Sequence, residues 1–240
     1  MRQGWWAGAP AAAILLLAGT LAAQPAARPE PPPADGLAAP NRPGWTVDAR
    51  TGCWVWNPSP KPGETVTWSG ACPNGPAEGE GEGEWRHVEN GVPWVELYSG
   101  NLRDGRLDGR GSVASPDGTG YQGDWRNARP HGRGVALLPR GVRYEGEFRD
   151  GNRSGRGIQT WPDGTRYDGE WRNGRADGTG TFTSRTGSFS GTWFQGCFID
   201  GQGRIVAIER RLEDCREGPG TPTSAPGGAG QTRGSNEFAL

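Results

Sequence analysis

A pattern that recurs every 23 residues constrains this chain more than any other feature. A typical copy has an aromatic residue, a glycine and a second aromatic residue at alternate positions, and ends in Gly-x-Gly; Leu102 replaces the second aromatic residue in the copy that opens with Tyr98. Most copies also carry a glycine between these two parts. Three consecutive copies open with Tyr121, Tyr144 and Tyr167. A fixed period of this length indicates stacked repeats, each of which buries its apolar face against its neighbours.

The same register extends in both directions and predicts six units. They begin near residues 68, 98, 121, 144, 167 and 189 and together span residues 68–203. The first unit is degenerate because Cys72 stands at the second aromatic position, and the last carries its closing motif one residue late, at Gly201 and Gly203. The residues expected to form the repeat core are Tyr98, Tyr121, Trp125, Tyr144, Phe148, Tyr167, Trp171, Phe189 and Trp193.

The local pattern predicts β-hairpins. Alternate residues of a strand share one face, so the aromatic rings should line one side of the sheet. Asp104-Gly105, Asp150-Gly151 and Asn173-Gly174 are pairs that two-residue hairpin turns favour. The predicted fold is therefore all-β: an elongated antiparallel meander of stacked hairpins in a single sheet, with a disulfide at each end.

The face opposite the rings is predicted to carry a ladder of opposite charges between neighbouring strands. Its members are the acids Asp124, Glu145, Glu147, Asp168 and Glu170 and the bases Arg110, Arg133 and Arg156. An ordinary soluble surface is the simpler interpretation of the same residues.

These positions, recurring together at fixed offsets, resemble the MORN repeat family over roughly residues 68–203. The resemblance implies a single, elongated, twisted sheet. Some members of the family carry a kinase or methyltransferase domain beyond the repeats, and we expect residues 204–240 to be too short for one.

The segments outside the repeats have their own signatures. Residues 1–23 resemble a secretory signal peptide, with Arg2 before a short apolar run and small residues at the expected cleavage site. A Pro- and Ala-rich disordered leader is predicted for residues 24–44, and a disordered tail for residues 217–240. Export, together with a composition rich in Gly, Ala and Arg, suggests a Gram-negative bacterium.

Each end of the repeats is predicted to carry a cap. At residues 45–67, Trp54–Trp56 and Thr65–Trp68 are β-prone runs on either side of a Pro-rich turn, so a hairpin between them should cover the first repeat. Residues 204–216 should form the C-terminal cap, beginning with a last strand.

Four cysteines allow three disulfide pairings. Their placement near the ends favours two local bridges, Cys53–Cys72 and Cys197–Cys215. A zinc site is the alternative, but the chain has no Cys-x-x-Cys, and neither histidine falls at ligand spacing. Disulfides and a signal peptide together predict a periplasmic or secreted protein.

Composition and motifs argue against several function classes. The formal net charge of −1 gives no reason to expect nucleic acid as a partner. Hydrolase and phosphate-binding motifs are absent from the sequence, so we expect no enzyme, no catalytic residue, no cofactor and no metal. Glu78–Glu84, where Glu and Gly alternate, could offer oxygens to calcium, but a solvated acidic strand is favoured because the carboxylates are spread along it.

Two functional hypotheses follow. The first is a non-enzymatic, exported scaffold that binds another protein, or a second copy of itself, through the repeat ribbon. The alternative is a cell-wall or polysaccharide-binding module that uses exposed tryptophans, with Trp85, Trp94 and Trp161 as the candidate binding surface. Membrane-lipid binding, which has been attributed to other MORN proteins, ranks third because the sequence has no basic cluster.

Overall fold

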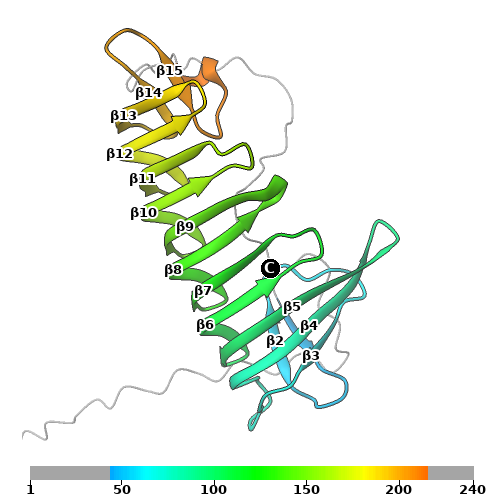
Figure 1. Cartoon of the computed structure of the whole chain (residues 1–240). Helices are drawn as coiled ribbons and strands as arrows, with labels where there is room; N and C mark the ends of the chain where they lie inside the picture. Colours follow the sequence, from blue (N-terminus) through cyan, green and yellow to red (C-terminus); the bar gives the residue numbers. More distant parts are fainter. Residues whose placement is uncertain (1–43, 216–240) are drawn as a thin grey trace, which may run out of the picture. The chain divides into compact units, whose positions relative to one another are not determined.

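A computed structural model describes residues 44–215 (Figure 1). The predicted signal peptide, the tail at residues 217–240 and all of the predicted leader except Gly44 lie outside the described residues. Within residues 44–215, no helix is long and apolar enough to cross a membrane.

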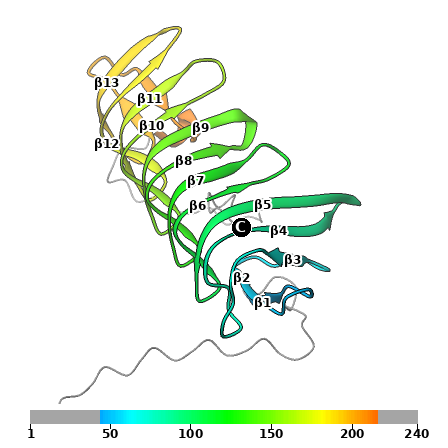
Figure 2. The same ribbon diagram turned by 60° about the horizontal axis from the view of Figure 1, so that its bottom comes forward.

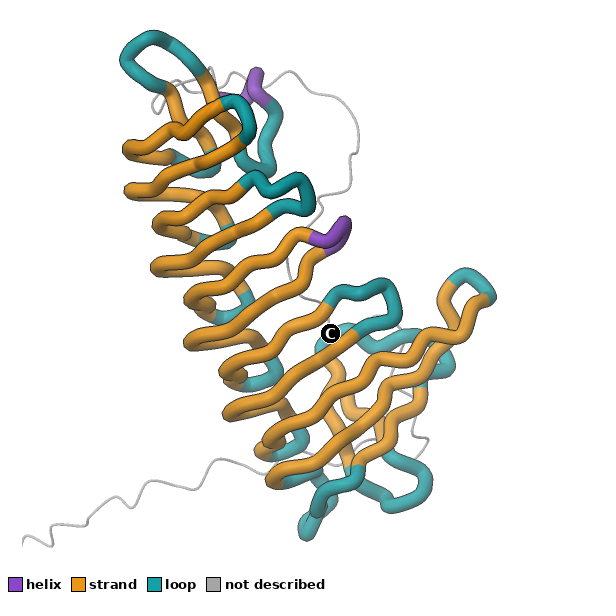
Figure 3. The backbone as a smooth tube through the Cα atoms, in the orientation of Figure 1, coloured by secondary structure: helices purple, strands orange, loops and turns teal. Residues whose placement is uncertain are grey.

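Eleven strands form one antiparallel sheet in which each strand pairs with its neighbours in sequence (Figures 1 and 2). They are β3 (Thr65–Trp68), β4 (Gly79–Glu89), β5 (Val92–Arg103), β6 (Arg106–Ala114), β7 (Gly120–Arg126), β8 (Arg129–Leu138), β9 (Val142–Arg149), β10 (Asn152–Thr160), β11 (Arg166–Arg172), β12 (Arg175–Ser184) and β13 (Gly187–Trp193). A 3-10 turn, η1 (Pro139–Gly141), joins β8 to β9. The predicted all-β antiparallel meander is confirmed, and Figure 3 shows that strands make up most of the described chain.

The two-residue turns have the backbone geometry that hairpins of this kind require. Asp150 and Gly151 both have positive φ, at 50° and 89°, which matches the right-handed twist of the flanking strands. The third repeat has Asn127-Ala128 at this place, and Ala128 also adopts a positive φ of 61°. Its backbone N–H donates to the carbonyl of Leu107 at 2.8 Å, so the turn is held against the repeat before it.

A row of glycines crosses the sheet, one from each strand between β4 and β13. Consecutive members face each other across neighbouring strands in every pairing. We call these residues the glycine row: Gly81, Gly100, Gly111, Gly123, Gly134, Gly146, Gly157, Gly169, Gly180 and Gly191.

One face of the sheet is here called the aromatic face. Tyrosine and tryptophan rings on this face cover the glycine row and form the core. Tyr144 and Tyr167 are fully buried. From Tyr121 to Trp193 neighbouring rings of this core meet edge to face, as in the Tyr144–Trp171 pair, whose ring centroids are 5.2 Å apart at 86°. Of the residues expected in the repeat core, Phe189 is only partly buried and the other eight are buried.

The N-terminal end differs from the prediction. The expected hairpin between Trp54–Trp56 and Thr65–Trp68 is wrong, because β2 (Trp54–Asn57) pairs with the short strand β1 (Gly44–Val47), whereas β3 pairs with β4. Two contacts explain the difference. The ring of Trp68, at the end of β3, stacks on the ring of Tyr98 in β5, and the backbone N–H of Trp68 donates to the buried carboxylate of Asp48 at 2.9 Å.

The C-terminal end also departs from the repeat pattern. The expected last Gly-x-Gly motif, at Gly201 and Gly203, does not join the sheet. It lies between β14 (Cys197–Ile199) and β15 (Ile205–Ala207), which form a two-stranded sheet of their own. The Phe198 ring lies over Gly191 of β13, in the space that a side chain at Gly191 would need.

A short 3-10 helix, η2 (Leu212–Cys215), follows β15. The two predicted disulfides, Cys53–Cys72 and Cys197–Cys215, are confirmed, each with 5.5 Å between the Cα atoms.

Candidate functional site

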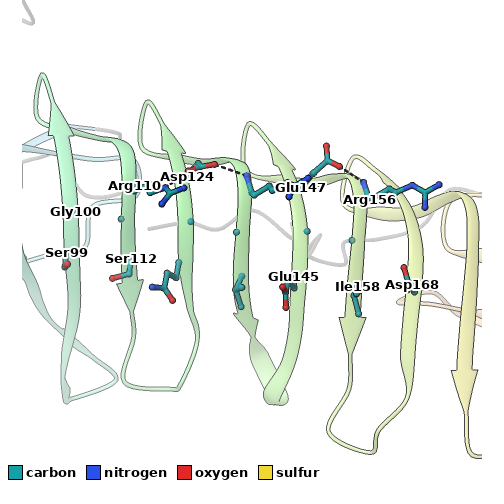
Figure 4. Close-up of a pocket in the computed structure, with 18 of the residues that line it drawn as sticks. Ser99, Gly100, Arg110, Ser112, Asp124, Glu145, Glu147, Arg156, Ile158 and Asp168 are labelled. Carbon is teal, nitrogen blue, oxygen red and sulfur yellow. Dashed lines mark hydrogen bonds and ion pairs between the residues drawn. The ribbon is translucent and has the colours of Figure 1, made fainter.

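The face opposite the aromatic rings, here called the outer face, carries a long groove. The Cβ positions of the glycine row point to the aromatic face, under the tyrosine rings, so on the outer face the backbone of this row forms a floor between two lines of side chains (Figure 4). The groove crosses the strands from β4 to β11 and has a volume of about 750 Å³. A second depression of about 440 Å³ continues it to β13.

The two walls of the outer groove differ in chemistry. One wall is mostly small or neutral, with two carboxylates: Ser99, Ser112, Gln122, Val135, Glu145, Ile158 and Asp168. The other wall alternates in charge from strand to strand: Arg110, Asp124, Arg133, Glu147 and Arg156. This alternation continues beyond the main depression with Glu170.

The carboxylates of the charged wall accept hydrogen bonds from backbone N–H groups. Asp124 accepts a hydrogen bond from the N–H of Arg133 at 3.1 Å, and Glu147 accepts one from the N–H of Arg156 at 3.1 Å. Both N–H groups follow a glycine with positive φ, Gly132 or Gly155, where the strand bulges.

The same contact in the next repeat shifts a pKa. Glu170 accepts from the N–H of Thr179 at 2.7 Å. This hydrogen bond, together with the Thr179 hydroxyl and the charges of Arg156 and Arg172, lowers the pKa of Glu170 below its usual value.

The predicted ladder of ion pairs is therefore only partly present. Arg110 pairs with Asp124 at 3.7 Å. The guanidinium groups of Arg133 and Arg156 form no ion pair within residues 44–215. The prediction failed for these pairs because the bulge offers each carboxylate a fixed N–H donor at close range. Exposed arginines are left along the groove at intervals of one repeat.

The structure brings only two of the three candidate tryptophans near each other. Trp85 on β4 and Trp94 on β5 belong to one hairpin, where Trp94 faces His87 across the strands. Trp161 lies beyond the end of β10, several strands away, where its ring packs against Phe182. All three are partly buried, and their role in binding stays a prediction.

Sequence reasoning missed a buried polar cluster on the aromatic face. Arg153 and Gln159 of β10 and Glu209 after β15 meet there, with the Arg153 side chain 6% exposed and Gln159 fully buried. A signal was present, because β10 carries Arg and Gln where the corresponding strands of other repeats have smaller or apolar residues. Those residues are Leu107 and Val113, Pro130 and Ala136, and Ala176 and Phe182.

The Glu209 carboxylate is held ionised in this cluster. Burial acts to raise its pKa, but the hydrogen bonds and charge of Arg153 and the amide of Gln159 outweigh burial and lower the pKa below the usual value. Among residues 44–215, no group of three His, Cys, Asp or Glu side chains is placed to hold a metal ion.

Comparison with models of known protein families matches the MORN repeat to residues 98–120, 121–143, 144–166 and 167–189. The first residues of these matches coincide with the starts of four of the six predicted units. No curated protein matches the chain significantly.

Proposed function

Residues 98–189 of this chain are four consecutive MORN repeats, and on this basis we propose that the protein is a non-enzymatic, exported scaffold that binds another protein along its outer groove. The groove itself carries this proposal. The rings of the aromatic face are buried in the core. The open surface that runs along the repeats is therefore the groove of the outer face.

The three arginines of the charged wall would pair with acidic side chains of an extended partner segment, and the five carboxylates of the groove, Glu80, Asp124, Glu145, Glu147 and Asp168, would pair with basic ones. Arg110, Arg133 and Arg156 stand two strands apart, which is about 9.6 Å in a β-sheet. A polyproline II segment rises about 3.1 Å per residue with three residues per turn, so acidic side chains three residues apart would lie on one side of it and match this interval. Exposed charges of this kind guide association and set register more than they add affinity.

The two disulfides support the exported part of the proposal. Disulfides persist in oxidising compartments and are rare in the cytosol. Here Cys53–Cys72 links the residue before β2 to the segment between β3 and β4, and Cys197–Cys215 links β14 to η2, as expected for a protein that functions outside the cytosol.

Site-specific photo-crosslinking tests the proposal. A photoreactive amino acid at Gln122, which is exposed on the groove wall, should form an adduct with one protein partner in the cell envelope. The matched control places the same probe at Arg126, which is exposed at the end of the same strand but outside the groove. Equal adducts from both positions, or none from Gln122, would contradict groove binding. Turnover of a substrate by the isolated protein would contradict the non-enzymatic part.

The polysaccharide hypothesis keeps one supporting observation: Trp85 and Trp94 lie on neighbouring strands of one hairpin. We propose it as the second candidate. It predicts that Trp85→Ala and Trp94→Ala reduce retention on isolated cell-wall polysaccharide, whereas Trp161→Ala, at a separate place, has a smaller effect. Unchanged retention in all three variants would exclude these residues.

A further inference from the structure

Three hydrogen-bond donors converge on a single carboxylate on the aromatic face. Arg153 donates from Nη1 to Oε1 of Glu209 at 3.0 Å and from Nη2 to Oε2 at 2.7 Å. The amide nitrogen of Gln159 donates to Oε1 at 2.8 Å. A planar guanidinium binding both oxygens of a carboxylate is the strongest ion-pair geometry that proteins use.

The repeats hold these donors in place independently of Glu209. Arg153 also donates from Nη2 to the carbonyl of Gly174 at 2.6 Å and from Nη1 to the side-chain oxygen of Gln159. Its guanidinium lies 4.5 Å from the ring centre of Trp171 and 5.9 Å from that of Tyr144. All of these groups belong to β9, β10, β11 or the turn after β11. The main sheet therefore holds the Arg153 guanidinium and the Gln159 amide in place without Glu209.

The packing of a repeat does not require a polar pair at this place. Neighbouring repeats fill the position of Arg153 with Leu107, Pro130 or Ala176, which are buried. A buried guanidinium is unfavourable without a partner charge. The repeat at residues 144–166 therefore has a specific requirement for an anion that the neighbouring repeats lack.

The carboxylate arrives from outside the repeats. Glu209 is 50 residues from Gln159 and 56 from Arg153 in sequence. Its side chain is one-third exposed, and its backbone has a positive φ of 55°, unusual for a residue with a side chain. The chain thus turns sharply at Glu209, and this turn places the Glu209 carboxylate against Arg153 and Gln159 of the main sheet.

We propose that Arg153 and Gln159 form a carboxylate-binding site on the aromatic face, that Glu209 is its ligand within the chain, and that an acidic side chain of a partner protein competes with Glu209 for it. The site lies on the face opposite the outer groove, so it does not depend on groove binding. A competing ligand would present Glu or Asp at a sharp bend, as the cap does at Glu209.

Chemical rescue tests the site directly. Glu209→Gly removes the carboxylate and suits the positive φ, so the backbone is not strained further. We expect propionate to raise the melting temperature of this variant by several degrees, with no effect on the wild type and none from propionamide. The rescue should disappear in Glu209→Gly/Arg153→Leu. Glu213→Ala, which removes an exposed carboxylate from the same cap, should show no response to propionate. A folded Glu209→Gly variant that ignores propionate would overturn the proposal.

A second measurement tests carboxylate binding from outside the chain and does not rely on the melting of that variant. A labelled peptide of residues 205–214 should bind the full-length Glu209→Gly/Cys197→Ser/Cys215→Ser protein, in which the chain's own carboxylate no longer occupies the site and the disulfide no longer fixes β14 to η2. It should bind at least about tenfold more tightly than the same peptide with Gln in place of Glu209, because the charged hydrogen bonds are lost. Equal affinity of the two peptides would overturn the proposal.

Discussion

The hydroxyl of Tyr144 lies directly over Gly157 on the neighbouring strand, in the space that any side chain at Gly157 would need. The same hydroxyl donates a hydrogen bond to the carbonyl of Glu147 at 3.0 Å, which fixes the ring in this position. Tyr121 over Gly134 and Tyr167 over Gly180 repeat the arrangement. The glycine at these places is therefore required by the ring that covers it rather than by a special backbone angle.

This relationship predicts that Gly157→Ala destabilises the protein. The added methyl group would collide with the Tyr144 ring, and overpacking of this kind costs about 1–3 kcal/mol. Urea unfolding measures the effect. Gly201→Ala is the matched control, because a methyl group there would meet nothing within 4 Å. Equal stability of Gly157→Ala and the wild type would show that the ring can move aside.

The sequence predicted the sheet because the repeat encodes it locally. The spacing of rings and glycines places the rings on one face, and Asp-Gly or Asn-Gly pairs specify the turns, so each hairpin can be predicted from its own 23 residues. The ends have no such repetition. Whether Trp54–Trp56 pairs with the strand before it or the strand after it depends on contacts such as Trp68 with Tyr98, which only the folded chain reveals.

Replacing Ala128 with glycine is predicted to stabilise the protein, in contrast to Gly157→Ala. Ala128 has a φ of 61° at the turn position where other repeats carry Gly105, Gly151 and Gly174. A left-handed conformation costs a residue with a Cβ about 1–2 kcal/mol. Ala128→Gly should raise stability by up to about 1 kcal/mol, because the greater freedom of glycine in the unfolded chain and the lost buried methyl group offset part of the gain. A lower denaturation midpoint would mean that the methyl packing dominates.

The ion pair at Glu209 predicts a dependence on pH. Because its pKa is lower in the folded than in the unfolded protein, the stability that ionised Glu209 contributes is fully present above the usual pKa of 4.5 and is lost as pH falls through the folded value. Glu209→Gln should cost about 2–4 kcal/mol at neutral pH, since it leaves a buried guanidinium without its counter-charge. The difference from wild type should shrink below pH 4.5. A difference independent of pH would contradict this account.

The cap should be held jointly by the Cys197–Cys215 disulfide and by Glu209. A bridge closing a loop of this length, with a sequence separation of 18, stabilises by about 3 kcal/mol. Cys197→Ser/Cys215→Ser should therefore lose about that much. When this change is combined with Glu209→Gln, the loss of unfolding free energy should be smaller than the sum of the two separate losses. Once one change has detached the cap, the second interaction contributes less. Strictly additive losses of unfolding free energy, measured by thermal unfolding, would show that the disulfide and the Glu209 ion pair act independently.

The candidate sites were harder to predict than the fold. The charges of the outer face could be placed from the alternation of side chains, but the choice of Asp124 and Glu147 to bind backbone N–H groups depends on bulges at Gly132 and Gly155. The Arg153–Glu209 pair joins residues 56 apart in sequence and has no local signature. Only comparison of Arg153 with the same position in other repeats could have indicated it.

The most direct test of the scaffold proposal compares two triple variants in a cross-linked pull-down from the cell envelope. Arg110→Ser/Arg133→Ser/Arg156→Ser removes the groove arginines. Arg126→Ser/Arg149→Ser/Arg172→Ser removes the same charge at the same spacing outside the groove. We expect the groove variant to lose its protein partner while remaining folded, and the control variant to retain it. Equal retention by both variants would contradict groove binding.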